Sequence, residues 1–261
     1  PMLPHKNLIP DINLTPYSIW LATVVVSGIS YLSYLLKRYV FHESGTLVSG
    51  IIGGLYSSTA TISVLARKSR KASEQEATDY VAAMLLAVSM MFLRFMILIL
   101  IFSREIFLSI YPYLLIMSVV SAIVGWFVHS RQKLPKDTSV ESEEDDSSNP
   151  LEFKVALIFA VLFVVFTFLT HYTLVYAGTG GLNLLSFVSG FSDITPFILN
   201  LLQNTGSVAA LIITACSMQA IISNIMVNMF YALFFAGKGS KLRPWILGGF
   251  GVVIACNLVL L

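Results

Sequence analysis

Long uninterrupted apolar runs dominate the chain and determine its predicted architecture. Residues 83–102 (AMLLAVSMMFLRFMILILIF) and 155–170 (VALIFAVLFVVFTFLT) are long enough, or nearly so, to cross a hydrocarbon core of about 30 Å as helices. These runs are continuous instead of alternating between apolar and polar residues, which argues against strands. The pattern therefore predicts an all-α integral membrane protein.

The composition agrees with this class. Hydrophobic residues make up 56% of the chain and charged residues 11%, with a mean hydropathy of +0.81. A soluble domain carries roughly 25% charged residues, so this chain has too few of them to cover itself with a solvated surface. Eight segments can be placed at membrane depth, at residues 17–36, 45–66, 80–102, 108–129, 152–176, 181–203, 207–236 and 243–261.

A polar linker divides the chain into two membrane halves. Residues 130–150 end in an acidic, serine-rich stretch that cannot bury enough apolar surface to fold, so we expect a disordered connection. The predicted domains are a first repeat at 1–129 and a second repeat at 151–261. Each repeat contains four of the eight segments.

Short internal matches indicate a duplication. GGLYSSTATI (53–62) aligns with SGFSDITPFI (189–198) at an offset of 136 residues, and SMMFLR (89–94) aligns with SNIMVN (223–228) at an offset of 134. Two matches in the same order and at nearly the same offset favour a repeat over chance similarity. The aligned pairs are Gly54 with Gly190, Ser57 with Asp193, Thr59 with Thr195, Ser89 with Ser223, and Arg94 with Asn228.

Segments 45–66 and 181–203 are the weakest candidates for crossings, because glycine and proline interrupt them. Irregular backbone at mid-membrane leaves polar groups unpaired unless protein or a water-filled cavity surrounds it. We therefore predict that both segments are re-entrant hairpins. The residues expected to break them are Gly50, Gly53, Gly54, Gly190 and Pro196.

The distribution of Lys and Arg distinguishes two topologies. If all eight segments cross, in a parallel repeat of four and four, the two sides carry nine and six of these residues. If the two weak segments re-enter, one side carries thirteen and the other only Lys6 and Arg104, which satisfies the positive-inside rule much better. Each half then has three crossings, so the repeat is inverted. We expect the first hairpin to enter from the cytoplasm and the second from outside.

Polar side chains in the two hairpins are the main candidates for chemistry. Asp193 is a carboxylate in an apolar stretch, and a charge at mid-membrane costs at least about 2.5–3.5 kcal/mol. Broken helices that meet near the midplane form the substrate site of many secondary transporters. A carboxylate among hydroxyls suits a cation or a proton, while the simpler interpretation is a cluster that only satisfies hairpin backbone. The hydroxyl residues are Ser57, Ser58, Thr59, Thr61, Ser192 and Thr195.

Three further polar residues lie inside predicted helices. Arg94 is too deep in its segment to be an interface anchor, so we expect it to neutralise Asp193, to bind an anionic substrate group or to cap a hairpin carbonyl. Asn224 and Asn228 are one turn apart and share a helix face. They either line the same cavity or hydrogen-bond between helices.

Other classes of function lack support in the sequence. There is no basic stripe with interleaved aromatic residues, so nucleic acid is not an expected partner. His5, His42, His129 and His171 are scattered without ligand spacing, and the identity of any metal is left unknown. No nucleophile elbow, P-loop or HExxH motif is present, so we expect neither an enzyme nor a cofactor.

Three stretches resemble a known family. SGIIGGLYSSTATISVLARKSR (49–70), SGFSDITPF (189–197) and IISNIMVN (221–228) are similar to the MgtC/SapB-associated membrane proteins that carry the domain of unknown function 4010. The resemblance extends over nearly the whole chain and implies a loose link to magnesium transport. The family pattern has Asp at the position of Thr195 and Lys at the position of Asn228, which implies a contact between these two positions.

Two functions remain open at this point. The first is a secondary transporter or channel-like protein for a small ion, either a cation or a proton-coupled ion, with its site at the crossed hairpins. The second is a non-transporting membrane regulator or scaffold that binds another membrane protein. For both we expect a multi-pass protein of the cell inner membrane in contact with lipid, and a homo-oligomer is left open.

Overall fold

The computed structural model describes residues 4, 6–9, 12, 14–40, 45–70, 72, 74–131, 153–204, 208–237 and 242–260. Apart from an isolated bridge between Ile9 and Ile12, the secondary structure in these ranges is helical. The expected all-α membrane fold is confirmed. The elements are α1 (Pro16–Leu35), the π-helical turn η1 (Leu36–Val40), α2 (Thr46–Lys68), α3 (Glu74–Phe102), α4 (Arg104–Ser130), α5 (Phe153–Ser189), α6 (Ile194–Gln203), α7 (Ala210–Ala236) and α8 (Arg243–Leu260).

Six of these helices are long and apolar enough to cross a membrane by length and composition, namely α1 to α5 and α7. The six include α2, which was predicted to re-enter and which folds back on itself, and they do not include α8, which was predicted to cross. At 18 residues, α8 spans about 27 Å, slightly less than a hydrocarbon core, and does not reach the length of the six. The architecture is that of a multi-pass helical membrane protein, whose apolar outer surface contacts lipid.

The helix α2 folds back on itself. Its backbone is non-helical at Ser57, with φ −159° and ψ 108°. A Cβ added to Gly53 would lie 2.4 Å from Oγ1 of Thr61, although eight residues along a straight helix span about 12 Å. We call residues 46–68 the first hairpin, with a first arm at 46–56, a tip at Ser57 and a second arm at 58–68.

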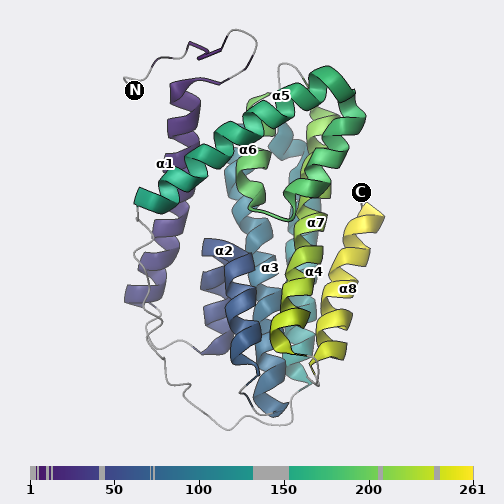
Figure 1. Cartoon of the computed structure of the whole chain (residues 1–261). Coiled ribbons are helices and arrows are strands. Elements are labelled where there is room, and N and C mark those ends of the chain that lie inside the picture. Colours follow the sequence, from purple (N-terminus) through teal and green to yellow (C-terminus); the bar gives the residue numbers. More distant parts are fainter. Residues whose placement is uncertain are drawn as a thin grey trace.

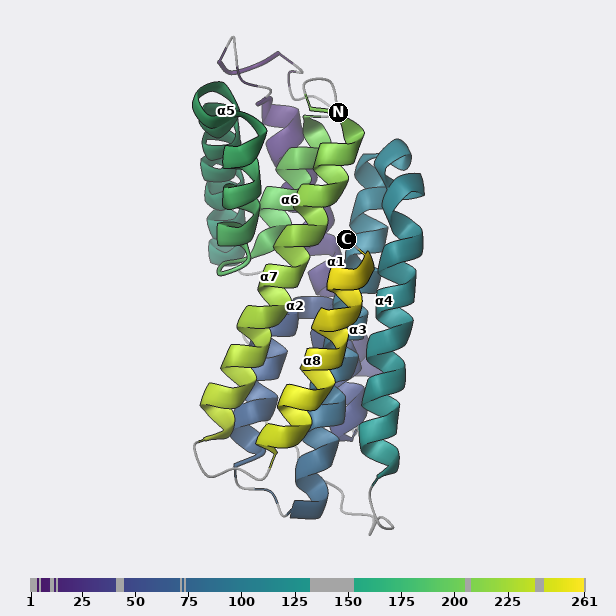
Figure 2. The ribbon, with the colours of Figure 1, turned by 90° about the vertical axis from the view of Figure 1, so that its right-hand side faces the viewer.

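The second hairpin is formed by the end of α5 together with α6. A positive φ of 60° at Gly178 breaks α5, and the preceding part, 153–177, runs obliquely across one half of the bundle (Figure 1). Residues 179–189 then descend, and α6 returns beside them (Figure 2). We call residues 179–203 the second hairpin, with its tip at 190–193.

The two hairpins enter from opposite ends of the bundle. The guanidinium of Arg67, at the base of the first hairpin, lies 4.3 Å from the ring centroid of Phe235 at the C-terminal end of α7. At the base of the second hairpin, Asn204 accepts a hydrogen bond from the amide of Val208, just before the N-terminal end of α7. Because α7 is 27 residues long, these bases are about 40 Å apart. The tips therefore approach each other inside the bundle (Figure 1).

Contacts between each hairpin and its following helix repeat at a constant offset. A Cβ added to Gly54 would lie 2.6 Å from Cα of Ala87 in α3, and one added to Gly190 would lie 2.3 Å from Cβ of Ser223 in α7. Gly190 and Ser223 both lie 136 residues after their counterparts. Ser223 thus corresponds to Ala87 at these contacts, whereas the aligned motifs had paired it with Ser89.

The helices α3 and α7 form the centre of the molecule, with 56% and 61% of their spanning windows buried against 17% for α1. Two serines join α3 to α4, since the hydroxyl of Ser89 donates to the carbonyl of Ser118 over 2.8 Å and the reverse bond measures 3.1 Å. Residues 132–150 of the predicted linker lie outside the described residues. The division into two domains stays a prediction.

Candidate ion site at the hairpin tips

The tip of the first hairpin divides α2 into two helical arms. Ser57 is extended, and its hydroxyl accepts a long hydrogen bond of 3.4 Å from the amide of Ala60. This makes Ser57 the N-cap of the second arm. The tip therefore brings the carbonyl end of one arm and the amide end of the other to the same place.

Arg94 of α3 caps the carbonyl end of the first arm. Its Nη1 donates to the carbonyl of Tyr56 over 2.6 Å, so a positive charge lies where the dipole of the arm ends negatively. The side chain is only 8% exposed, and its Nε has no hydrogen-bond partner. Of the three roles predicted for Arg94, capping of a hairpin carbonyl is the one that the structure shows.

Polar groups of α7 complete the second tip. The amide of Asn224 donates to the carbonyl of Gly190 over 3.2 Å, and the hydroxyl of Ser223 donates to the carbonyl of Phe187 over 2.7 Å. Asp193 begins α6 as its N-cap, with Oδ1 accepting from the amide of Thr195 over 3.0 Å. Here a carboxylate, and not a hydroxyl, lies at the amide end of the returning arm.

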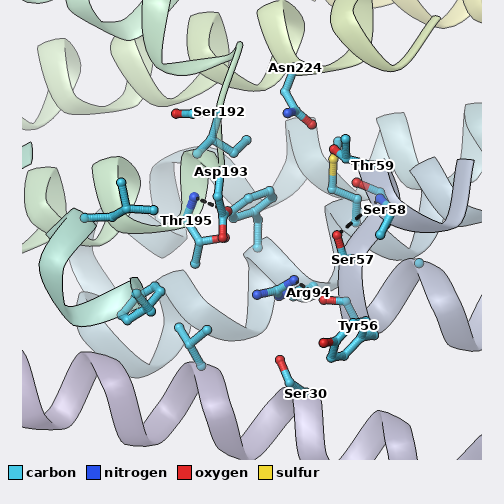
Figure 3. A pocket seen from close by; sticks show the side chains of 18 of the residues that line it. Ser30, Tyr56, Ser57, Ser58, Thr59, Arg94, Ser192, Asp193, Thr195 and Asn224 are labelled. Carbon is cyan, nitrogen blue, oxygen red and sulfur yellow. Dashed lines mark hydrogen bonds between the residues drawn. The ribbon is translucent and has the colours of Figure 1, made fainter. Parts of the chain in front are cut away.

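Both tips open into one cavity of about 550 Å³ (Figure 3), a size typical of small-ligand sites. Arg94 and Asp193 line it together with residues of α1, α2, α5, α6 and α7. They form no direct ion pair, since the ion pair found among the described residues joins His129 to Asp79 instead. A buried cation and an exposed carboxylate thus share the cavity without neutralising each other by contact.

Most of the predicted site residues do meet in this cavity. Those that line it are Gly54, Ser57, Ser58, Thr59, Arg94, Gly190, Ser192, Asp193, Thr195 and Asn224. Five others lie outside it: Gly50, Gly53, Thr61, Pro196 and Asn228.

The two outlying polar residues have structural contacts. Thr61 packs against Gly53 within the first hairpin. The amide of Asn228 donates to Oδ1 of Asn224 over 3.1 Å, and its own side chain is fully buried. Neither Asn228 nor Thr195 has a side-chain hydrogen bond to the other, so the contact implied by the family pattern takes no such form in this chain.

Of the five residues expected to break the hairpins, Gly190 does lie at a break, in the turn that follows α5. The other three glycines and the proline do not. Gly50 and Gly54 lie within the first arm, where the missing Cβ lets the backbone of α3 approach closely. Pro196 is the third residue of α6, a position where no helical amide bond is lost. The first hairpin breaks at Ser57 instead, and the second breaks at 190–193, a segment that begins with the predicted Gly190.

Residues of α1 also line the cavity, and they were not predicted from the sequence. Ser27 and Ser30 contribute from α1, and Ile158, Phe159 and Leu162 from the oblique part of α5. Two serines three residues apart on an otherwise apolar helix were the available signal, because such a spacing places both hydroxyls on one face.

Comparison with known proteins identifies the family. The family described as "Domain of unknown function (DUF4010)" matches residues 24–236, a range that contains both hairpins and the helices that cap them. The chain belongs to the DUF4010 family. An uncharacterized protein of Aquifex aeolicus (strain VF5) is 24% identical over 224 residues, which cover 85% of this chain and 96% of that protein. No solved structure matches this DUF4010 chain.

The cavity of this DUF4010 protein is lined by groups that can bind a charged ligand. Among the described residues, no cluster of three or more His, Cys, Asp or Glu side chains could hold a metal ion. The polar groups that line the cavity are instead one guanidinium, one carboxylate, one side-chain amide, hydroxyls and helix ends, and the rest of the lining is apolar. Such groups bind ions and protons and can exchange them with water.

Proposed function

We propose that this protein is a secondary transporter or channel-like protein for a small ion, with its site at the two hairpin tips. One observation carries the proposal: hairpins inserted from opposite ends meet at a cavity that contains Arg94 and Asp193 without a direct ion pair. Discontinuous helices that meet near the midplane are how many transporters hold an ion in a membrane. Transport suits these groups better than catalysis, for which the lining residues include no nucleophile paired with a base.

Asp193 is the group we assign to proton coupling. It is the one carboxylate among the residues that line the cavity, and its side chain is exposed there. A proton that binds at this position would change the net charge of the site by one unit. Because an uncompensated charge in a medium of low polarity is costly, the protonation state of Asp193 would control which ions can enter.

The charge distribution supports a bacterial-type inner-membrane orientation. Both ends of the first hairpin, the start of α3, the ends of α4 and α7 and the start of α8 lie at one end of the bundle (Figure 1). Five basic residues lie at these helix ends or within two residues of them, namely Arg67, Lys68, Arg70, Arg131 and Arg243. By the positive-inside rule this end faces the cytoplasm.

Ion flux into proteoliposomes tests the proposal. We expect flux of at least one of K⁺, Na⁺, Mg²⁺, chloride or nitrate that depends on a proton gradient, with Mg²⁺ included because of the resemblance to MgtC/SapB-associated proteins. Asp193→Asn should remove the dependence on the gradient. Glu105→Gln is the matched control, since it removes an exposed carboxylate in the first turn of α4, outside the cavity.

Two outcomes would contradict transport. The first is absence of flux for every ion with folded, correctly inserted protein. The second is flux of equal size and equal gradient dependence in wild type and Asp193→Asn. Stable capture of a membrane protein together with absence of flux would favour the regulator or scaffold instead.

A further inference from the structure

Three carbonyl groups at the hairpin tips accept hydrogen bonds from buried side chains. Carbonyl ends of broken helices are the groups that coordinate cations in many transporters. Here Arg94 donates to the carbonyl of Tyr56, Asn224 to that of Gly190 and Ser223 to that of Phe187. A cation that entered the cavity would therefore share these oxygens with protein donors, and at Tyr56 it would meet the positive charge of Arg94.

The amide ends differ in how they are compensated. The second arm of the first hairpin, 58–68, begins in the cavity wall with Ser58 and Thr59, and its cap is the distant hydroxyl of Ser57. The first amides of a helix lack partners within the helix and carry a partial positive charge. In α6 a carboxylate compensates this charge, whereas in the second arm of the first hairpin no charged side chain caps it.

Arg94 is an independent indication of a missing anion. More than nine-tenths of this side chain is buried, yet among the described residues it makes one hydrogen bond, through Nη1, although a guanidinium has five N–H donors. Figure 3 shows it between Asp193 on one side and Tyr56 and Ser57 on the other. A buried guanidinium with donors to spare is a site for an anionic group.

We propose that the transported ion is a small anion, which binds between Arg94 and the amide end of residues 58–68, and that Asp193 takes up one proton with it. This inference rests on the proposed function and names its substrate class. The titratable groups that line the cavity are Arg94, Asp193 and Tyr56. With the anion bound and Asp193 protonated, the charges of Arg94 and the anion cancel, whereas an ionised Asp193 would leave the site with a net negative charge.

Thermal stability of the purified full chain is the test. The probes are the potassium salts of chloride, nitrate, acetate and phosphate, each exchanged for gluconate at constant ionic strength. Gluconate serves as the bulky reference anion. We expect at least one of the four small anions to raise the melting temperature, because a ligand that binds only the folded state stabilises it. The shift should be larger at acidic than at alkaline pH.

Two variants at the site give effects of opposite sign. Arg94→Gln should weaken anion binding about tenfold or more, as expected for loss of a hydrogen bond to a charged group, and Arg94→Lys should restore part of it. Asp193→Asn should bind the anion as tightly at alkaline pH as wild type does at acidic pH. Asparagine is an equally good N-cap, so this variant keeps the start of α6 and remains informative if Arg94→Gln does not fold.

Control variants outside the cavity, together with flux measurements, test anion binding and transport separately. Arg104→Gln and Glu105→Gln change exposed charges outside the cavity and should leave the anion response unchanged. Stabilisation by Na⁺, K⁺ or Mg²⁺ but by none of the four anions, with loss of that response in Asp193→Asn, would overturn the anion while leaving transport standing. Anion binding without any ion flux would contradict transport while leaving the anion site standing.

Discussion

The two hairpin tips share a backbone arrangement and differ in their charges. At both tips a glycine packs against the following helix, Gly54 on Ala87 and Gly190 on Ser223, with the same offset between the pairs. The first tip has a guanidinium at its carbonyl end and a hydroxyl at its amide end. The second tip has neutral donors at its carbonyl end and a carboxylate at its amide end.

This difference separates structural from functional residues. Close packing of glycine on a helix recurs at both tips, so it belongs to the scaffold. Arg94 and Asp193 each occur at one tip only, and they lie in the same cavity. We infer that duplication supplied the two opposed hairpins and that divergence of the capping residues supplied the ion site.

The largest expected effect is in thiol labelling, which tests the topology. Both ends of one hairpin should be accessible from one side of the membrane only, and both ends of the other hairpin from the opposite side only. In a background with Cys216→Ala and Cys256→Ala, cysteines at Gly45 and Lys68 should react with an impermeant thiol reagent from one side of the membrane only. Cysteines at Thr179 and Gln203 should react from the opposite side only. Reaction of the two ends of one hairpin from different sides would show that the segment crosses the membrane.

Replacing the tip glycines should destabilise the protein strongly. Gly54→Ala and Gly190→Ala place a methyl group 2.6 Å and 2.3 Å from the nearest atoms of α3 and α7, and we expect each to cost about 1–3 kcal/mol from overpacking. Unfolding in SDS titrations measures the loss. Gly28→Ala is the control, because an added Cβ there meets nothing within 4 Å. Equal stability of Gly54→Ala and Gly28→Ala would contradict the claim that Gly54 is needed for close packing on α3.

The residues that cap the carbonyl ends should respond differently at the two tips. Asn224→Ala should cost about 1–3 kcal/mol, because it leaves the carbonyl of Gly190 and the amide of Asn228 without their partners. Arg94→Met should cost less than about 1 kcal/mol, since losing one bond is offset by removing a buried charge with an unpaired Nε. Arg94→Met should nevertheless lose the anion response. If Arg94→Met lost more stability than Asn224→Ala, the assignment of Asn224 to stability and of Arg94 to anion binding would be wrong.

Replacing the N-cap residues of the two returning arms should have the smallest effects on stability. Asp193→Ala should destabilise by about 1 kcal/mol, because its carboxylate accepts a bond of 3.0 Å at the start of α6. Ser57→Ala should cost only about half as much, since its hydrogen bond of 3.4 Å is long. The same SDS titration, run on both variants side by side, compares them. A greater cost for Ser57→Ala would show that the first tip depends on its hydroxyl more than the geometry suggests.

The sequence predicted the hairpins and the main polar residues because their physical cause is local. Glycine-rich and hydroxyl-rich stretches are poor membrane helices, and Asp193 and Arg94 are costly in lipid wherever they lie. The oblique course of 153–177 and the part played by Ser27 and Ser30 were not predictable in the same way. Helix tilt and rotation depend on packing against neighbours, which a single helix sequence does not encode.

Asn228 illustrates the same limit. Its spacing from Asn224 correctly placed both residues on one face, but not which of them reaches the cavity. In the structure Asn224 lines the cavity, and Asn228 is buried one turn further along and holds the side chain of Asn224. A shared helix face therefore identifies residues that can contact each other. Only the position of the second tip relative to α7 determines which of the two lines the cavity and which supports the other.

Protection of both tips by one ion tests the central claim most directly. In the background with Cys216→Ala and Cys256→Ala, Thr59→Cys and Ser192→Cys each place one thiol in the cavity wall, on the first and second tip respectively. The account predicts that the anion with the largest thermal shift slows thiol labelling at both positions, with the same half-maximal concentration. Protection at one tip only, or at neither, would contradict a shared ion site.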